Sequence, residues 1–548
     1  MPTITCSYHD LQSLIGKTIP EPALRELLHN AKAELDQVHG DELSISCGDT
    51  NLPYLWSVEG IARFLRLQLG IDAGVHEVKP EKQQFTVLVD SSVSSIRPYI
   101  ACFVAKGPAL TESLLVQLIQ LQEKLSENFG RKRSKVSIGL YPFAKVQFPV
   151  VYKAVDPESV MFVPLEGRSE QTLTQILKTH PKGIQYRDIL SRAKRYPVLM
   201  DAAKQVLSFA PIINSATTGK LEPGTTELFF DATGTDKASV ELVAAIVAHA
   251  LADREYHIHP CSIKYGRQSL LCPELSSWKW RFDDAHIKHV LGISFAKQEI
   301  RTLLRKAGYD YKPPFVFIPS YRRDILHDAD IVEDIAIAYG YDKIESKELS
   351  SQTIGRPLEH MQFFANSRMT LAGLGFQECM NAMLSHKELL VEKMLIKDQG
   401  HVEIENPVSS LYDVVRSWLT PLLLEVLAKN KHISFPQRIF EQGLVVKNSG
   451  SIVQEVCVAG VLSHGSADYT SVRQDVEFLL KKIGISYTLA EEDQLWYIPG
   501  RSASIISNSV SCGVLGEINP EVLCKFGIEH PVSCFEISLT KILHTLQK

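Results

Sequence analysis

The apolar residues of this chain recur with two periods, about two in some stretches and about 3.6 in others, which are the periods of strands and helices. The clearest helical stretch covers residues 109–130, where leucines from Leu114 to Leu125 share one face and Gly130 marks the end. Residues 242–252, "LVAAIVAHALA", are apolar on every face, which indicates a buried helix too short to span a bilayer. The mixture predicts an α+β multidomain protein.

The same pattern predicts four domains. Residues 1–90 form an N-terminal α/β domain in which Ser57 caps a helix, and residues 91–265 alternate strands and helices. Residues 268–343 form a compact unit with two short helices, which end at Gly292 and Gly308, and a third, acidic one. On the acidic helix, Ile331, Ile335 and Ala338 are expected to face a core. Residues 350–548 form a further α/β module with several strand–turn units.

Composition narrows the class of protein. A chain of 548 residues is too long for one core, and its net charge of −5 gives no global attraction to nucleic acid. Any RNA contact must therefore come from a local basic patch. Ten cysteines without a CxxC pair indicate reduced thiols and argue against a zinc ribbon. The N-terminus lacks the pattern of a signal peptide, so we expect a cytoplasmic protein.

Residues 321–344, "YRRDILHDADIVEDIAIAYGYDKI", contain an acidic cluster. Its members are Asp324, Asp330, Glu333 and Asp334. On a helix from about 329 to 340, the last three fall within roughly a 100° arc, and Asp324 lies just upstream. Oxygen ligands without cysteine suit a hard cation, and Mg²⁺ is the ion we expect. The alternative is a solvated helix face with Arg322, Arg323 and Lys343 as counter-charges.

The stretch "IPSYRRDILHDADIVEDIAIAYGYDKI" resembles the B5 domain of the phenylalanyl-tRNA synthetase beta subunit. In that family an Asp, an Asp six residues later and two acids at nine and ten form a Mg²⁺ site shared with the alpha subunit. Asp324, Asp330, Glu333 and Asp334 match that spacing position by position. The resemblance therefore implies that these four residues bind Mg²⁺ together with an alpha partner.

The resemblance extends over almost the whole chain and fits the shorter archaeal and eukaryotic type. "NLPYLWSVEGIARFLRLQLG" is similar to the family's N-terminal phrase, and "PIINSATTG" to its B3/B4 editing region. Residues 404–430 and "IPGRSASI" resemble the class II synthetase-like module, which has an antiparallel sheet. This implies a B3/B4-type editing domain at 91–265 and a B5 domain, of the winged, DNA-binding-like type, at 268–343.

The class II-like module lacks the residues of an active site. A class II motif 2 needs an Arg followed two residues later by Glu, but Arg416 is followed by "SWL". The string Gly373, Gly375 and Glu378 lacks the terminal Arg of motif 3, and we interpret it as a turn at a helix end. The resemblance thus implies no catalytic residue for aminoacylation here, with ATP and phenylalanine bound by the alpha subunit.

The B3/B4 region of this family hydrolyses mischarged tyrosyl-tRNA, which requires polar groups that hold a water and distinguish a phenol from a phenyl ring. The candidates are Asn214, Ser215, Asp231, Thr235 and Asp236. The alternative is that these residues cap strands and turns.

A basic run is the candidate for RNA contact. Its residues are Arg131, Lys132, Arg133 and Lys135, which could bind tRNA phosphates or form a solvated loop.

The expected function is that of the beta subunit of phenylalanine–tRNA ligase. In an α2β2 heterotetramer it would attach phenylalanine to tRNA(Phe) with ATP, giving assembly, tRNA contacts and editing. Two other hypotheses are a stand-alone Mg²⁺-dependent hydrolase, which would turn over without a partner, and a non-enzymatic RNA-binding scaffold.

Overall fold

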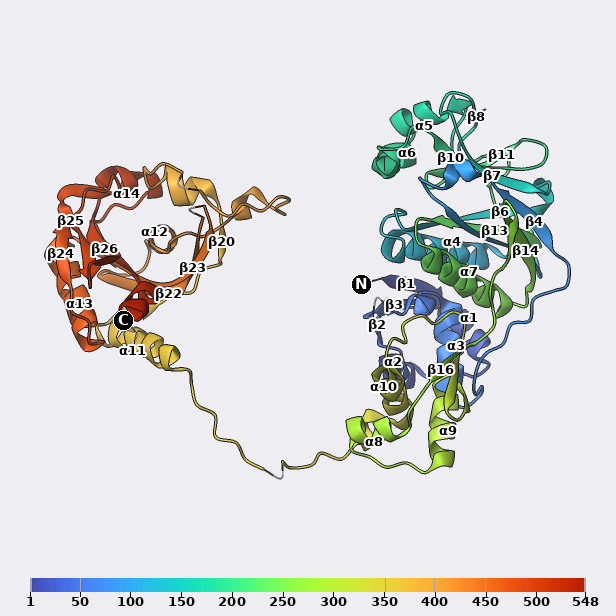
Figure 1. Cartoon of the computed structure of the whole chain (residues 1–548), viewed down its shortest axis with the longest axis horizontal. Helices are drawn as coiled ribbons and strands as arrows, with labels where there is room; N and C mark the ends of the chain where they lie inside the picture. Colours follow the sequence, from blue (N-terminus) through green and yellow to red (C-terminus); the bar gives the residue numbers. More distant parts are fainter. Residues whose placement is uncertain (1, 50, 350, 399, 449, 547–548) are drawn as a thin grey trace. The chain divides into compact units, whose positions relative to one another are not determined.

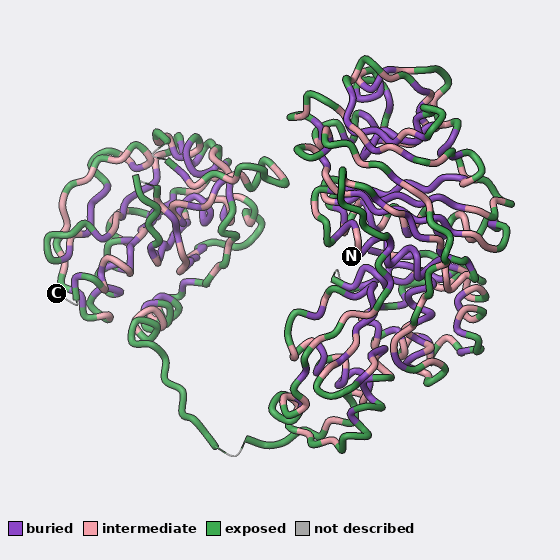
Figure 2. The backbone as a smooth tube through the Cα atoms, turned by 45° about the vertical axis from the view of Figure 1, so that its right-hand side comes forward, coloured by how far each residue is buried: buried purple, intermediate pink, exposed green. Residues whose placement is uncertain are grey.

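The computed structural model describes residues 2–49, 51–349, 351–398, 400–448 and 450–546. The chain divides into two units, residues 1–347 and residues 348–548, each with its own core (Figure 1). In both units the buried residues lie mainly in the strands and on the inward faces of the helices (Figure 2). No helix in the described part of the chain is long and apolar enough to cross a membrane.

Unit 1 begins with an antiparallel sheet of three strands in the order β1-β3-β2, packed against three helices. The predicted cap forms: the Ser57 side chain accepts a hydrogen bond from Gly60 N at 3.1 Å at the start of α3. Gly60 is required because a Cβ there would lie 1.7 Å from the carbonyl oxygen of Tyr54. The elements are β1 (Thr3–Ser7), α1 (Tyr8–Ile15), α2 (Glu21–Asn30), β2 (Ala33–His39), β3 (Glu42–Cys47) and α3 (Val58–Gln68).

A ten-stranded sheet forms the centre of unit 1, with the order β12-β11-β10-β7-β4-β14-β5-β13-β6 and β15 beside β14. Its strands are β4 (Phe85–Val89), β5 (Tyr99–Lys106), β6 (Val136–Pro142), β7 (Val150–Val155), β10 (Tyr196–Met200), β11 (Val206–Phe209), β12 (Ile213–Asn214), β13 (Glu227–Gly234), β14 (His257–Tyr265) and β15 (Gln268–Cys272). Helices α4 (Glu112–Lys124) and α7 (Lys237–Ala252) lie along one face of this sheet. As predicted, α7 is buried almost throughout. Four small elements pack beside β10 and β11. They are β8 (Met161–Phe162), β9 (Gln171–Thr172), α5 (Leu173–Thr179) and α6 (Pro181–Tyr186).

The sheet extends past both predicted domain boundaries. Strand β4 ends at residue 89 and pairs in parallel with β14 and β7, although the boundary was placed at residue 90. Strand β15 begins at 268, the predicted start of the next domain, yet it pairs with β14. Strand β4 is held by partners remote in sequence, which local hydrophobic pattern does not reveal, whereas β15 forms a hairpin with the neighbouring β14.

The last part of unit 1 is a three-stranded sheet, β16-β18-β17, covered by three helices. Helix α8 ends at Gly292 in the left-handed conformation, and Gly308 follows α9, both as predicted. In α10 the predicted core residues Ile331, Ile335 and Ala338 are buried. The elements are β16 (Trp278–Arg281), α8 (Ala285–Leu291), α9 (Lys297–Lys306), β17 (Asp310–Lys312), β18 (Phe315–Ile318) and α10 (Asp328–Tyr339).

Unit 2 is built on a seven-stranded sheet in the order β19-β22-β23-β27-β26-β25-β24, antiparallel except where the short β19 pairs with β22. Its strands are β19 (Gln377–Glu378), β22 (Gln437–Asn448), β23 (Ile452–Ser463), β24 (Thr488–Glu491), β25 (Tyr497–Ser507), β26 (Val510–Ile518) and β27 (Val532–Ser538). The helices are α11 (Glu359–Gly373), α12 (Thr420–Lys429), α13 (Tyr469–Lys482), α14 (Pro520–Phe526) and α15 (Leu539–Leu546), and a small ribbon joins β20 (Leu384–Ser385) to β21 (Val414–Val415).

Candidate functional sites

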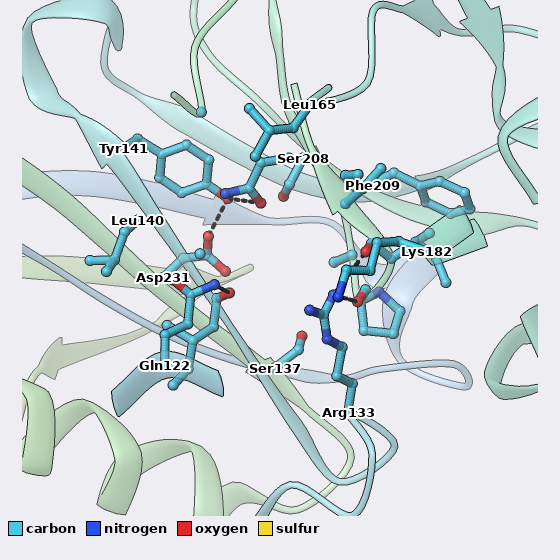
Figure 3. Close-up of a pocket in the computed structure, with 18 of the residues that line it drawn as sticks. Gln122, Arg133, Ser137, Leu140, Tyr141, Leu165, Lys182, Ser208, Phe209 and Asp231 are labelled. Atoms are coloured by element: carbon cyan, nitrogen blue, oxygen red, sulfur yellow. Dashed lines mark hydrogen bonds between the residues drawn. The ribbon is translucent and has the colours of Figure 1, made fainter. Parts of the chain in front are cut away.

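A cavity of about 390 Å³ opens in unit 1 where β6, β11, β12 and β13 meet α4 (Figure 3). Its apolar wall comes from residues such as Ile119, Leu165, Phe209 and Ile213. The polar side chains that line it are Gln122, Glu123, Arg133, Ser137, Tyr141, Glu166, Lys182, Ser208, Asn214, Lys220 and Asp231. A largely apolar pocket with a few convergent polar groups is the usual form of a small-molecule site.

Asp231 is the buried carboxylate of this cavity. It projects from β13, where the other residues after Glu227 are apolar or small, and it is only 3% exposed. The Tyr141 hydroxyl donates to its Oδ1 at 2.6 Å and lies 3.5 Å from Asn214 Oδ1 (Figure 3). Gly139, opposite Asp231 in the β6–β13 pairing, leaves room for this contact, because a Cβ there would lie 2.3 Å from both oxygens.

Burial raises the pKa of Asp231 to about 6, since the apolar surroundings disfavour the charged form. The Tyr141 hydrogen bond and the nearby Arg97 act in the opposite direction. Arg97 is itself buried and donates to Thr233 Oγ1 at 3.0 Å and to Ser137 Oγ at 3.0 Å. A carboxylate that ionises near neutral pH can accept a proton from a water or hold a ligand hydroxyl.

Only part of the predicted editing set lies at this cavity. Asn214 and Asp231 line it, whereas Ser215, Thr235 and Asp236 do not. The Ser215 Oγ accepts from Thr217 N at 3.3 Å, in the turn that follows β12.

The two remaining candidates stabilise local backbone. Thr235 Oγ1 donates to Ser134 O at 3.3 Å, and Asp236 caps α7 by accepting from Ser239 N at 3.0 Å. The hydrogen bonds from Ser239 keep the pKa of Asp236 below its usual value. These residues follow the alternative interpretation, in which Asp and Thr cap turns and helices.

Tyr141, Arg97 and Gly139 were not among the predicted site residues. Residues 137, 139 and 141 alternate along β6 and therefore share a face, and β13 pairs residue 231 opposite 139. That register depends on strands about 90 positions apart, so the sequence alone did not reveal it. The one local signal was an aspartate inside the apolar run "LFFDATG".

The basic run divides into two kinds of residue. Arg133 lines the cavity, donates to Ile212 O at 2.9 Å and lies 4.3 Å from the centre of the Tyr186 ring. Lys135 forms an ion pair with Asp236 at 3.5 Å. Arg131 and Lys132 are exposed and, like Arg133, have positive φ angles, which places them in a tight turn.

The acidic cluster is organised around Arg322, which is buried and ion-paired with Asp324 and, at 2.8 Å, with Asp334. The Tyr309 hydroxyl also donates to Asp334. Burial raises the pKa of Asp334, and Arg322 opposes that shift. Although burial alone would lower the pKa of Arg322, the carboxylates raise it, so Arg322 stays protonated.

The other two acids are used separately. Asp330 accepts hydrogen bonds from Leu326 N at 2.7 Å and His327 N at 2.8 Å at the start of α10, and the His327 side chain completes the capping box. Glu333 is half exposed and pairs with Lys32 at 3.0 Å.

The predicted set of four carboxylates therefore does not converge on one ion position. Among the described residues no three or more Asp, Glu, His or Cys side chains are placed to hold a metal ion. The arginine between Asp324 and Asp334 already supplies the positive charge that a cation would bring. In this chain by itself, the four residues do not fit a Mg²⁺ site; Arg322 does act as a counter-charge, but in a buried ion pair and not on a solvated helix face.

In unit 2 the candidate synthetase residues have structural roles. Arg416 is buried and ion-paired with Glu441, and its Nε donates to Leu444 O at 2.9 Å. Gly373 ends α11 and Gly375 has a φ of 84°, which confirms a turn at a helix end. Glu378 is ion-paired with Arg368 at 2.7 Å.

Comparison with known proteins gives matches along the whole chain. Residues 280–341 match the tRNA synthetase B5 domain, and residues 344–539 match the phenylalanyl tRNA synthetase beta chain CLM domain. A solved N-terminal fragment of the phenylalanyl-tRNA synthetase beta subunit from Pyrococcus horikoshii superposes with a TM-score of 0.60 at 36% identity, covering 62% of this chain and all of the fragment.

Full-length relatives agree. The phenylalanine–tRNA ligase beta subunit of Thermococcus sibiricus is 35% identical over 98% of both chains. That of Archaeoglobus fulgidus is 34% identical over 100% of this chain and 99% of its own length. The expected family is thereby confirmed: this chain belongs to the beta subunits of phenylalanine–tRNA ligase, and so to the aminoacyl-tRNA synthetases.

Proposed function

We propose that this chain acts with an alpha subunit, in an α2β2 heterotetramer, to attach L-phenylalanine to tRNA(Phe) at the expense of ATP. The alignment over 98% of this chain and of its relatives carries the proposal. The ion pair of Arg416 supports the view that the beta chain does not bind ATP itself. A buried arginine paired with Glu441 is not free to bind a triphosphate. ATP and phenylalanine then bind to the alpha subunit, and unit 2 serves as the inactive class II-like module.

The test is charging of tRNA(Phe) with labelled phenylalanine, by this chain alone and after co-purification with the small subunit from the same source. We expect charging only in the mixture. Mg²⁺-dependent turnover by the chain alone would favour the stand-alone hydrolase. A stable mixture that binds tRNA but never charges it would favour the scaffold.

We further propose that the unit 1 cavity is a B3/B4-type editing site that hydrolyses mischarged tyrosyl-tRNA(Phe). The observation that carries this is Asp231, the one buried carboxylate among the described residues that line the cavity. A phenol could donate a second hydrogen bond to this carboxylate, which already accepts one from Tyr141, whereas a phenyl ring could not. Asn214 stands on the same wall as a second polar group.

For tRNA contact, Arg131 and Lys132 are the better placed residues of the basic run. Both are exposed, whereas Arg133 and Lys135 already have partners within the chain. An exposed side chain can bind a backbone phosphate without giving up an existing ion pair or hydrogen bond. Because Arg133 lines the cavity, it would contact the tRNA only at the aminoacylated end, once that end has entered the cavity.

The raised pKa of Asp231 predicts a specific dependence of stability on pH. The unfolded chain loses this proton near pH 3.8, but the folded chain keeps it up to about pH 6. The stabilising effect of the bound proton is complete below that window and is lost as pH rises through it. An Asp231→Asn variant cannot ionise, so we expect it to unfold at a higher temperature than the wild type at pH 7.5.

The advantage should approach ~3 kcal/mol, because the pKa of Asp231 rises from 3.8 in the unfolded chain to about 6 in the folded chain, and a pKa difference of one corresponds to about 1.36 kcal/mol. It should fall below ~1 kcal/mol at pH 4, where the folded wild type is uncharged at this position and only part of the unfolded wild type is ionised. Thermal denaturation of the two proteins from pH 4 to pH 8 measures the difference. An advantage that does not change with pH would contradict a buried, ionisable Asp231.

Mg²⁺ held jointly with the alpha subunit remains a proposal for the assembled complex. Asp330 and Glu333 lie outside the Arg322 pair, so they are the members of the cluster that a partner can reach. We expect Asp330→Ala to weaken assembly about tenfold, through loss of a charge at the interface and of a cap worth ~1 kcal/mol.

Asp330→Asn separates these causes, because an amide oxygen still caps α10 but carries no charge. We expect it to weaken assembly as well, measured by titration of the alpha subunit with and without Mg²⁺. The matched control is Asp188→Asn, at an almost fully exposed side chain. Unchanged assembly and unchanged Mg²⁺ affinity in both Asp330 variants would refute an interface role for this carboxylate.

A further inference from the structure

Unit 2 contains a second cavity, of about 420 Å³, which the proposed function does not use. It lies where the ends of β22, β26 and β27 meet the segments before α12 and β25. Its lining includes two tryptophans, two lysines, a histidine and a serine: Trp418, Trp496, Lys447, Lys541, His401 and Ser417. Its volume falls within the range of small-molecule sites.

Two tryptophans form the aromatic side of this cavity. Their ring centres are 5.2 Å apart, with the planes inclined by 65°. The Trp418 indole donates to Leu390 O at 3.2 Å. The Trp496 indole N–H is shielded from solvent but has no acceptor among the described residues. A buried donor without an acceptor is costly, and a bound anion would satisfy it.

The charged side of the cavity is basic. Lys541 forms no ion pair within the described chain; its Nζ has a long contact of 3.4 Å with Ser511 O. Lys447 pairs with Glu455 at 3.0 Å. The carboxylate of Glu536 lines the same space, but it accepts from Leu419 N, Thr420 N and Thr420 Oγ1 at 2.7–2.9 Å and so caps α12.

Hydrogen bonds hold His401 and Ser417, two further residues of the cavity lining, in place. His401 Nδ1 lies 2.9 Å from Asp398 Oδ1, and its Nε2 lies 3.1 Å from Ser417 Oγ. Hydrogen bonds from Gly400 N and His401 hold the pKa of Asp398 at about 2, so this acid stays ionised. The His401 side chain is 3% exposed, and the wall is therefore formed before any ligand arrives.

We propose that this cavity binds a small aromatic anion, a ring bearing one carboxylate or phosphate group. The ring packs against Trp418 and Trp496, and the anionic group pairs with the Lys541 ammonium and accepts from the Trp496 indole N–H. A neutral aromatic compound gains the ring contact only, and a simple anion gains the charge contact only. The site is separate from the unit 1 cavity, so its binding does not depend on the editing proposal.

Four probes test the proposal on the full-length chain: 3-phenylpropionate, phenyl phosphate, benzyl alcohol and acetate. Binding is followed by calorimetry and by quenching of tryptophan fluorescence. We expect saturable binding of at least one aromatic anion, with benzyl alcohol and acetate at least tenfold weaker. The comparison of 3-phenylpropionate with phenyl phosphate shows whether carboxylate or phosphate is preferred.

Variants locate the binding. Lys541→Met should weaken the aromatic anion about tenfold and leave benzyl alcohol unchanged, because only the charge is removed. Trp496→Phe keeps a ring but removes the N–H donor, and it should weaken the anion several-fold. Lys481→Met, an exposed lysine on α13, is the control and should bind like the wild type. Absence of saturable binding, or equal binding by both cavity variants and the wild type, would overturn the proposal.

Discussion

Replacing Asp231 by alanine should reduce the hydrolysis of tyrosyl-tRNA(Phe) by the assembled enzyme by at least ~100-fold, the scale set by loss of a group that positions or deprotonates a reactant. Asp231 is the one carboxylate buried among the described residues of the unit 1 cavity. Without it, the Tyr141 hydroxyl loses its acceptor at 2.6 Å, and the cavity loses its buried carboxylate. Charging with phenylalanine should be unaffected, because aminoacylation is proposed for the alpha subunit.

Two further variants make this result specific. Asp231→Asn keeps an acceptor for Tyr141 but cannot ionise, so deacylation should fall to an intermediate rate if the charge is needed. Asp236→Asn is the matched control: it is five positions further along the chain, caps α7 and does not line the cavity. Its deacylation rate should stay within twofold of the wild type. A well-folded Asp231→Ala enzyme that deacylates at the normal rate would exclude this cavity as the editing site.

The parts of the fold that could be predicted are those whose cause is local. The period of the leucines in 109–130, the apolar run of α7 and the glycines after α8 and α9 each depend on residues a few positions apart. The boundary at 90 could not be placed, because β4 pairs with β14 and β7, which lie much later in the sequence. The boundary at 268 divides a hairpin, because β15 pairs with the strand directly before it, β14. The cavity depends on the same long-range pairing.

The acidic cluster shows the limit of spacing as evidence. Four carboxylates at family spacing predicted one ion site, and their positions on and before α10 are as expected. The side chains nevertheless turn to three different partners: Arg322, the backbone at the start of the helix, and Lys32. Lys32 is about 300 positions away from the acids in sequence. Spacing identified which residues lie near one another, but not which charge each of them neutralises.

The largest expected loss of stability follows from Arg322→Met. The guanidinium is buried between two carboxylates, and it lies 5.2 Å from the centre of the Tyr309 ring and 5.6 Å from that of Tyr54. Methionine retains much of the packing but leaves Asp324 and Asp334 without a counter-charge. Removing one partner of a buried ion pair typically costs ~3–5 kcal/mol, because the remaining charge stays desolvated. We expect the unfolding transition of unit 1 to shift to a clearly lower temperature at pH 7.5.

The dependence on pH and a compensating variant show whether charge is the cause. Burial already raises the pKa of Asp334, and without Arg322 it should rise further. The variant then gains protons on folding, so its deficit should shrink as pH falls from 7.5 to 5. Arg322→Met combined with Asp324→Asn and Asp334→Asn should recover most of the lost stability. Arg323→Met is the control, since Arg323 is exposed and its guanidinium lies 5.5 Å from the centre of the Trp278 ring. Equal thermal stability of the Arg322 and Arg323 variants at pH 7.5 would mean that the buried pair is not what holds this helix in place.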